Sequence, residues 1–283
     1  MPLPDEAKSL QAAMRFDAVD DQQSTDHLVR SMVAADEHTA VQVLRDWSAD
    51  QLRITDGATV VELGCGPGTA AADLASRVGS SGRVIGIDSS EAMIDTARGA
   101  YASVPVVEFV VGDALSLDLA DDAVDGYRSE RTFQHLSDPE TALAEAVRVV
   151  RPGGRVAVID TDWGTLAVDH PDRMLTERLS GAPRRFPLNS WSGRRLYSQM
   201  RRVGLVDLVV RVESLVATSW DPDTSPGVQG LPPFAMVAQS AQSMGVFDSD
   251  EAARWLAALE DEARAGRFFL MLSMVAVVGT VPS

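Results

Sequence analysis

Two patterns of apolar and polar residues alternate through the middle of the chain, one typical of strands and one typical of helices. Short runs rich in valine and isoleucine are separated by longer stretches in which apolar residues recur every three or four positions. The runs predict strands at 59–63, 83–88, 106–111, 123–128 and 155–160. The stretches between them predict helices at about 69–78, 90–101 and 138–150. This alternation indicates an α/β fold, in which right-handed crossovers give a parallel sheet with helices on both faces.

The two ends of the chain are less regular. A helix is expected over 28–52, after a polar arm. Beyond Asp160 the pattern predicts helices at about 191–203 and 248–265, strands at about 205–218 and 267–279, and irregular stretches at 161–190 and 219–235. We therefore expect an arm and helix over 1–52 that cover a binding site. The main domain would follow over 53–283, with cap insertions at about 161–190 and 219–247.

The most informative stretch is residues 59–69, TVVELGCGPGT. Gly64, Gly66 and Gly68 lie between a predicted strand and a predicted helix, where a tight turn needs positive φ and a ligand needs close backbone approach. The G-x-G-x-G spacing differs from the dinucleotide G-x-G-x-x-G, and no Gly-Lys-Ser/Thr follows as in a P-loop. The acidic Glu62 before the turn favours a ligand that carries positive charge.

Two aspartates end the next two predicted strands. Asp88 lies 20 positions beyond Gly68, where a nucleoside ribose needs a carboxylate for its two hydroxyl groups. Asp113 follows the third strand in Gly112-Asp113-Ala114. Each could be a simple turn or cap residue, but two at successive strand ends after a glycine turn favour a ligand site.

On these residues the sequence resembles the class I S-adenosylmethionine-dependent methyltransferases, whose first motif reads acidic-x-Gly-x-Gly-x-Gly. The segment 135–139, HLSDP, is similar to one in relatives that methylate small molecules, and the turn 151–154, RPGG, is typical of the family. The overall style resembles the ubiquinone and menaquinone group and the sugar or polyketide methyltransferases of bacteria. The motifs cover about 57–161. The resemblance implies a Rossmann-like seven-stranded sheet with an antiparallel last strand, an inserted substrate cap and S-adenosyl-L-methionine as cofactor.

The resemblance also implies roles for individual residues. Glu62, Gly64 and Gly66 would contact the methionine portion, and Gly68 would shape the turn. Asp88 would bind the ribose, and Asp113 and Ala114 would face the adenine. The full set of cofactor-binding residues that we expect is Glu62, Gly64, Gly66, Gly68, Asp88, Met93, Asp113, Ala114 and Arg131.

Methyl transfer from a sulfonium mainly needs a positioned nucleophile and exclusion of water. A base is needed only when the nucleophile must lose a proton. His135 is the candidate base, because a neutral imidazole near pH 7 can accept a proton from a hydroxyl. The alternative is a structural histidine that caps the helix beginning near Ser137. Glu130, Asp160 and Asp162 are further candidates at strand ends.

We expect the acceptor to be a small, fairly apolar metabolite methylated at O, N or C, in bacterial secondary or quinone-type metabolism. Aromatic and methionine side chains of the expected cap would line its pocket: Trp163, Phe186, Trp191, Trp220, Phe234 and Met236. The alternative is a protein that binds the cofactor without methylating, such as a cyclase or a binding module.

Charge and composition limit the classes of partner that we expect for this protein. The net charge of −16 disfavours nucleic acid and anionic membranes, and the Asn/Asp-Pro-Pro-Tyr motif of nucleic-acid amine methyltransferases is absent. No apolar run is long enough to insert into a membrane. A single cysteine, Cys65, fits a reducing cytoplasm, and no metal-ligand spacing appears. The oligomeric state is left open by the sequence.

Overall fold

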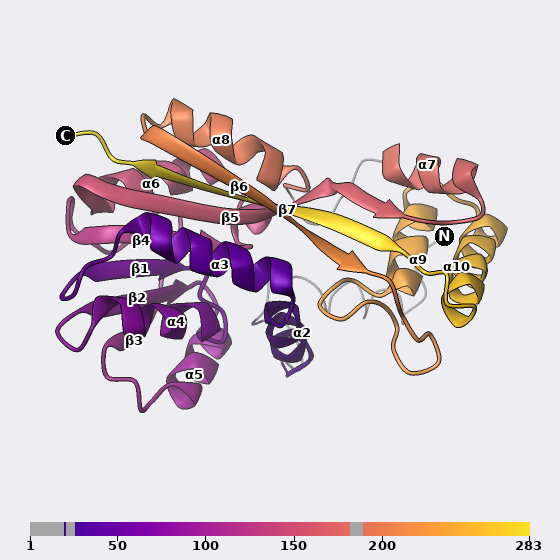
Figure 1. The fold of residues 1–283 in the computed structure, drawn as a ribbon, viewed down its shortest axis with the longest axis horizontal. Helices are drawn as coiled ribbons and strands as arrows, with labels where there is room; N and C mark the ends of the chain where they lie inside the picture. The colour runs from indigo at the N-terminus through magenta and orange to yellow at the C-terminus, as the bar shows by residue number, and fades with distance from the viewer. Residues whose placement is uncertain (1–19, 21–25, 182–188) are drawn as a thin grey trace.

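The computed structural model describes residues 20, 26–181 and 189–283 (Figure 1). Most of the predicted N-terminal arm and the predicted pocket residue Phe186 lie outside the described residues.

A mixed seven-stranded sheet forms the centre of the molecule, in the order β3-β2-β1-β4-β5-β7-β6. The first five strands in this order are parallel, and β7 is antiparallel to both of its neighbours. The strands are β1 Thr59–Leu63, β2 Arg83–Asp88, β3 Val107–Val111, β4 Val124–Glu130, β5 Val150–Val168, β6 Val206–Ala217 and β7 Leu270–Thr280. The expected sheet with its antiparallel last strand is confirmed.

Helices cover both faces of this sheet, as expected (Figure 1). They are α2 Asp26–Asp36, α3 Thr39–Leu52, α4 Thr69–Val78, α5 Glu91–Ala100, α6 Pro139–Val149, α7 Arg173–Gly181, α8 Ser192–Arg202, α9 Phe234–Ser243 and α10 Ser249–Arg264. Neighbouring residues of a strand point to opposite faces. Val60 therefore packs toward α4 and α5, and Val61 packs toward α6 and α8.

The single helix expected over 28–52 is wrong, because the structure has two helices there. His38 has an extended backbone between α2 and α3, with φ −67° and ψ 129°. Its Nε2 lies 2.7 Å from the carbonyl oxygen of Gln229, far away in the sequence. A tertiary contact thus accompanies the break, and the helical spacing of apolar residues does not show it.

The fifth strand is much longer than expected. It begins at Val150, which pairs with Val124 ahead of the predicted RPGG turn, and it continues through Val168. The irregular insertion expected at 161–190 is therefore wrong for its first part. The pairing of β5 with β7 continues on both sides of a register shift between Asp162 and Ala167. The shift interrupts the alternation of apolar and polar residues, so the sequence pattern does not reveal this part of the strand.

The outer ends of β5, β6 and β7 extend beyond the parallel sheet and carry α7, α9 and α10. We call these elements the cap lobe, which lies at one end of the elongated molecule (Figure 1). Its core is aromatic: the rings of Trp220 and Phe234 have centroids 4.6 Å apart, and Trp255 and Phe268 pack around them. The stretch expected to be irregular after 219 ends where α9 begins, at Phe234.

Candidate functional site

A cavity of about 640 Å³ lies between the carboxyl ends of β1, β2 and β4 and the cap lobe. This volume is within the range of roughly 300–1,000 Å³ that is typical of small-molecule sites. Residues of α2, the glycine turn, the segment after β4 and α9 all line it. One continuous space thus joins the predicted cofactor end to the cap.

The glycine turn has the backbone conformation that its spacing predicts. Gly64, Gly66 and Gly68 have φ values of 66°, 50° and 96°. A Cβ on Gly64 would lie 2.0 Å from Oγ1 of Thr132, so a larger residue has no room there. Gly64 lines the cavity directly. Gly66 lies against Met32, which lines the cavity, and Gly68 lies against Phe109, which does not.

The two predicted aspartates both line the cavity, at the ends of the adjacent strands β2 and β3. Asp88 accepts hydrogen bonds from the backbone N–H groups of Gly66 at 2.9 Å and Ser90 at 3.0 Å. Burial raises the pKa of Asp88 above its ordinary value, and these donors oppose the rise. Asp113 accepts from the N–H of Leu115 at 2.9 Å and is exposed at the cavity mouth. Predicted residues Met93 and Ala114 also line the cavity.

One described residue of the N-terminal arm reaches this end of the site. Asp20 accepts from Oγ of Ser90 at 2.6 Å and from the N–H of Glu91 at 3.0 Å. These are groups of the first turn of α5, next to Asp88. The hydrogen bond from Ser90 is the main cause of a pKa of Asp20 below its ordinary value. Asp20 was not predicted as a site residue, because a lone aspartate in a polar stretch has no periodic signal and its partner Ser90 lies 70 positions away in the sequence.

Glu62 does not line the cavity. It is fully buried, and its Oε2 accepts from Nε of Arg128 at 2.6 Å. Arg128 also donates to the carbonyl of Ala70 in the first turn of α4. In this structure Glu62 therefore lies behind the glycine turn, where it holds β4 and α4 together through Arg128.

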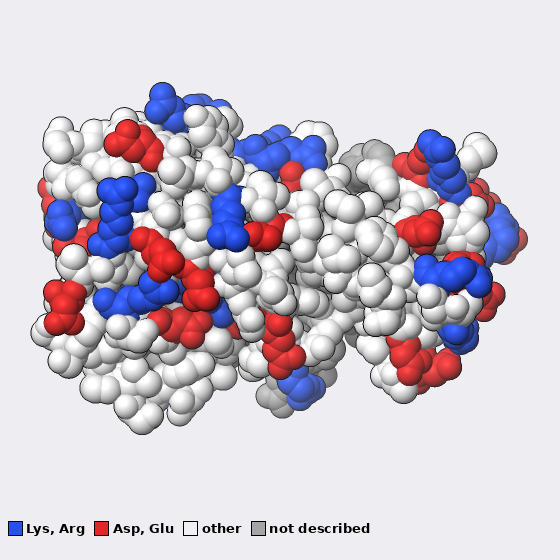
Figure 2. All heavy atoms as spheres, in the orientation of Figure 1, with Lys and Arg blue, Asp and Glu red and all other residues white. Residues whose placement is uncertain are grey.

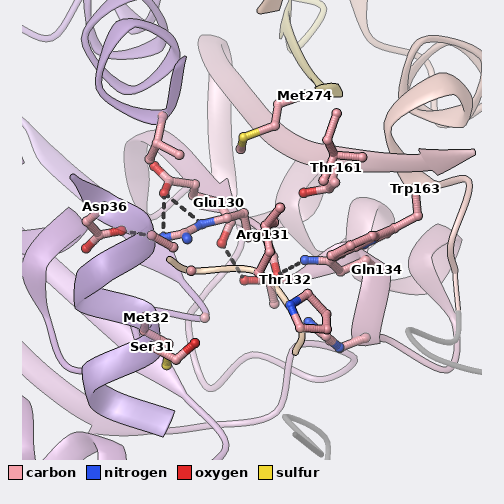
Figure 3. A pocket seen from close by; sticks show the side chains of 18 of the residues that line it. Ser31, Met32, Asp36, Glu130, Arg131, Thr132, Gln134, Thr161, Trp163 and Met274 are labelled. Carbon is pink, nitrogen blue, oxygen red and sulfur yellow. Dashed lines mark hydrogen bonds and ion pairs between the residues drawn. The ribbon is translucent and has the colours of Figure 1, made fainter. Parts of the chain in front are cut away.

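A network of ion pairs borders the cavity beside α2 and α3 (Figure 3). Arg45 donates to both carboxylate oxygens of Glu130 at 2.8 Å, and also to Asp36 at 2.8 Å. Arg131 contacts Asp36 and Glu130 from the other side. Burial alone would raise the pKa of Glu130, but Arg45 and Arg131 lower it to about 2. Glu130 is therefore ionised and a weak base near pH 7.

His135 lies at the end of a short 3₁₀ helix, Phe133–His135, and lines the cavity. Gln134, the residue before it, makes two hydrogen bonds. Its backbone N–H donates to Oδ2 of Asp160 at 2.6 Å, and Oε1 of the Gln134 side chain accepts from Nε1 of Trp163 at 2.6 Å (Figure 3). These contacts give the segment that carries His135 a defined position.

The other two base candidates lie away from the cavity lining. Asp160 is fully buried and accepts three hydrogen bonds, from Gln134, Thr161 and Ser192. Burial raises the pKa of Asp160 to about 7, although the three donors oppose the rise. Asp162 accepts from Nε of Arg194 at 2.6 Å. Of the four candidates, only His135 and Glu130 face the cavity.

The cap side of the cavity has a different character. All lining residues from Thr161 onward are uncharged, and most are aliphatic, aromatic or methionine side chains. The predicted residues Trp163, Phe234 and Met236 are among them. Trp220 belongs instead to the cap-lobe core, and Trp191 is half-exposed outside the cavity.

Within the described ranges, no group of three or more histidine, cysteine, aspartate or glutamate side chains is placed to hold a metal ion. No helix among those described is long and apolar enough to cross a membrane.

Residues 61–158 match a family model described as a methyltransferase domain. This segment contains the glycine turn, Asp88, Asp113 and His135. This part of the chain is therefore a methyltransferase domain.

The relatives of this chain align with it over different lengths. The chain is 37% identical over 234 residues to an uncharacterised 37.1 kDa protein in transposon TN4556 of Streptomyces fradiae, covering 81% of this chain and 64% of the relative. It is 36% identical over 118 residues to the 2-phytyl-1,4-naphtoquinone methyltransferase of Thermosynechococcus vestitus, covering 42% of this chain and 52% of the relative. The chain thus spans less than two thirds of the length of these relatives.

A solved structure shows the same fold. Phosphoethanolamine N-methyltransferase 2 of Haemonchus contortus, in complex with S-adenosyl-L-methionine, matches with a TM-score of 0.58 and 15% identity. The alignment covers 94% of this chain and 60% of that chain. The match to the 2-phytyl-1,4-naphtoquinone methyltransferase covers less than half of this chain.

Proposed function

We propose that this protein transfers a methyl group from S-adenosyl-L-methionine to a small, fairly apolar metabolite, at O, N or C. The observation that carries the proposal is the division of a single cavity into two ends. Every charged residue that lines it comes from α2, from α3 or from the carboxyl ends of β2, β3 and β4 and the residues just beyond them, and the cap end is uncharged. A charged acceptor at the cap end would lose water without gaining a partner there.

The described residues fit the cofactor at the other end. Gly64 lines the cavity and has no side chain, so a ligand can come close to its backbone. Asp88 presents a carboxylate at the end of β2, oriented by the N–H groups of Gly66 and Ser90. In our proposal Asp88 holds the ribose hydroxyls, and Asp113 with Ala114 borders the adenine. The cofactor supplies an activated methyl group.

The chain's own residues would then orient the acceptor and exclude water. Leu231, Phe234 and Met274 would press an apolar acceptor toward the cofactor end, since all three line the same cavity as Gly64. For a hydroxyl acceptor, His135 would take up the proton as the oxygen attacks. For an amine that is already neutral, positioning alone is sufficient.

Calorimetric titration with S-adenosylmethionine and S-adenosylhomocysteine tests the cofactor end. We expect micromolar binding, which corresponds to roughly −8 kcal/mol. Asp88→Ala should abolish it, and the control Asp118→Ala, at an exposed position outside the cavity, should not. Equal binding by both variants would contradict the proposed role of Asp88.

A panel of neutral hydroxylated aromatics, amines and polyketide-like compounds tests the acceptor end, with S-adenosylhomocysteine release as the readout. We expect turnover with apolar members and none with phosphorylated analogues. His135→Ala should lower kcat for hydroxyl acceptors and leave cofactor affinity unchanged. Tight cofactor binding without turnover of any member would favour the alternative, a protein that binds the cofactor but does not methylate.

We further infer that the protein acts in a cytoplasm, because its single cysteine is buried and needs no oxidising compartment. The net charge of −16 argues against a nucleic-acid substrate. Salt-sensitive RNA binding would contradict this.

A further inference from the structure

The strand β6 is an edge of the sheet and pairs only with β7. It is 12 residues long, and no backbone hydrogen bond links it to any other described segment outside this ladder. A long edge strand leaves a row of N–H and C=O groups available for another strand. Most proteins shorten, cover or charge such an edge.

The side chains of β6 are unusually apolar for an exposed edge. Eleven large apolar side chains are exposed among the described residues, and five of them belong to this one strand. They are Val206, Val209, Val210, Val212 and Val216. Val212 is 53% exposed and Val216 is 54% exposed, whereas Leu215 between them is buried toward the cavity.

Figure 2 shows acidic and basic side chains over the left half and the right end of this face, with a largely uncharged stretch between them. In the same orientation, β6 and β7 cross the middle of the view (Figure 1). Apolar surface concentrated on a free edge indicates an interaction site.

The sequence of β6 is complementary to itself in one antiparallel register. A two-fold axis perpendicular to the sheet at Val212 places Arg211 opposite Glu213 of a second copy, and Glu213 opposite the second Arg211. Opposite charges that face each other across strands are favourable. An axis one residue earlier would oppose Arg211 to itself, and one residue later would oppose Glu213 to itself. The charges therefore select the register centred on Val212.

The same register joins apolar positions on the other face of the strand. Val212 lies opposite Val212 of the second copy, and Leu208 lies opposite Val216. Arg211 and Glu213 now pair only within their own strand, at 2.8 Å, with side chains 40% and 31% exposed. Both are accessible enough to pair across an interface.

We propose that this protein forms a two-fold dimer in which β6 pairs antiparallel with β6 of a second copy, centred on Val212. The two sheets then continue into one, and the exposed valines of both edges are covered. Val210, Val212 and Val216 lie on the face of β6 opposite to Leu215, which lines the cavity. Each copy thus keeps its own site.

Sedimentation equilibrium of the full chain provides the first test. We expect a dimer for the wild type and a monomer for Val212→Lys, which places two like charges on the axis. The matched control is Val111→Lys on β3, the opposite edge of the sheet, where Val111 is 52% exposed. This control should remain dimeric. A monomeric wild type, or a dimer that Val212→Lys leaves intact, would overturn the proposal.

A charge exchange tests the register. Arg211→Glu should weaken the dimer at least tenfold, because it opposes glutamate to glutamate. The double variant Arg211→Glu with Glu213→Arg should restore wild-type association. Loss in both variants, or in neither, would contradict this register. Circular dichroism would confirm that each variant is folded.

Cross-linking gives a separate readout. Val212→Cys should form a covalent dimer on mild oxidation, because residues directly opposite in antiparallel strands are about 4.5–5.5 Å apart, within disulfide range. The native Cys65 is buried and does not compete. Val111→Cys should stay monomeric on a denaturing gel. Equal cross-linking at both positions would indicate random collision and overturn the proposal.

Discussion

Glu62 on β1 and Arg128 on β4 lie opposite each other in adjacent parallel strands, with Oε2 and Nε 2.6 Å apart. Both side chains are completely buried. Burial raises the pKa of Glu62, and Arg128 opposes the rise. The acid of the glycine motif is thus neutralised inside the fold, directly behind the turn that lines the cavity.

Arg128→Met should destabilise the protein by about 3–5 kcal/mol, because it leaves a buried carboxylate without its partner. The double variant Glu62→Leu with Arg128→Met should recover most of this loss, since a buried ion pair and an apolar pair of similar size are often close in stability. Chemical denaturation measures both. Arg83→Ala is the control: its pair with Glu108 is exposed, and its loss should cost about 1 kcal/mol or less. A double variant as unstable as the single one would contradict this account.

Glu130 should make stability sensitive to acid. Its pKa is about 2 in the folded protein, below the ordinary value of 4.5. Its contribution is therefore present above pH 4.5 and is lost as the pH falls toward 2. The difference in unfolding free energy between wild type and Glu130→Gln should be roughly 3 kcal/mol near pH 7 and shrink toward pH 3. Glu140→Gln, at an exposed ion pair with Arg202, should show little pH dependence.

Asp160 should have the opposite effect. Its folded pKa of about 7 exceeds the ordinary value of 3.8, so the folded protein binds this proton more tightly than the unfolded chain. The contribution of Asp160 to stability should therefore fall as the pH rises from about 4 to about 7, and then level off. Denaturation of wild type and Asp160→Asn between pH 4 and pH 8 measures it. A difference that grows with pH would contradict the raised pKa.

Gly230 should be needed for the close contact between its loop and Ala35 of α2. It has a φ of 74°, and a Cβ there would lie 2.6 Å from Cα of Ala35. Gly245 has a similar φ of 71° but no atom within 4 Å of its Cβ position. Gly245→Ala should cost only the strain of positive φ, about 1–2 kcal/mol. Gly230→Ala should cost more and should accelerate hydrogen exchange in α2. Equal losses in the two variants would show that this contact is unimportant.

Local signals account for the parts of the site that were predicted. The glycine turn, Asp88 and Asp113 each lie at the end of a short apolar strand, and a short run of valine and isoleucine shows where such a strand ends. Arg45 and Asp36 were missed because they lie on helices more than 80 residues before Glu130, and only folding brings them together. Asp20 was missed for the same reason.

The sequence by itself determined the order of strands and helices from 59 to 160, the glycine turn and the match to a methyltransferase domain, because these depend on neighbours along the chain. Only the tertiary structure decided that β5 continues to Val168, that α2 and α3 separate at His38, and that Glu62 pairs with Arg128. Each of these depends on a partner distant in the sequence: β7, Gln229 and β4. Periodicity records which face of an element is buried, but it carries no information about which distant residue will cover that face.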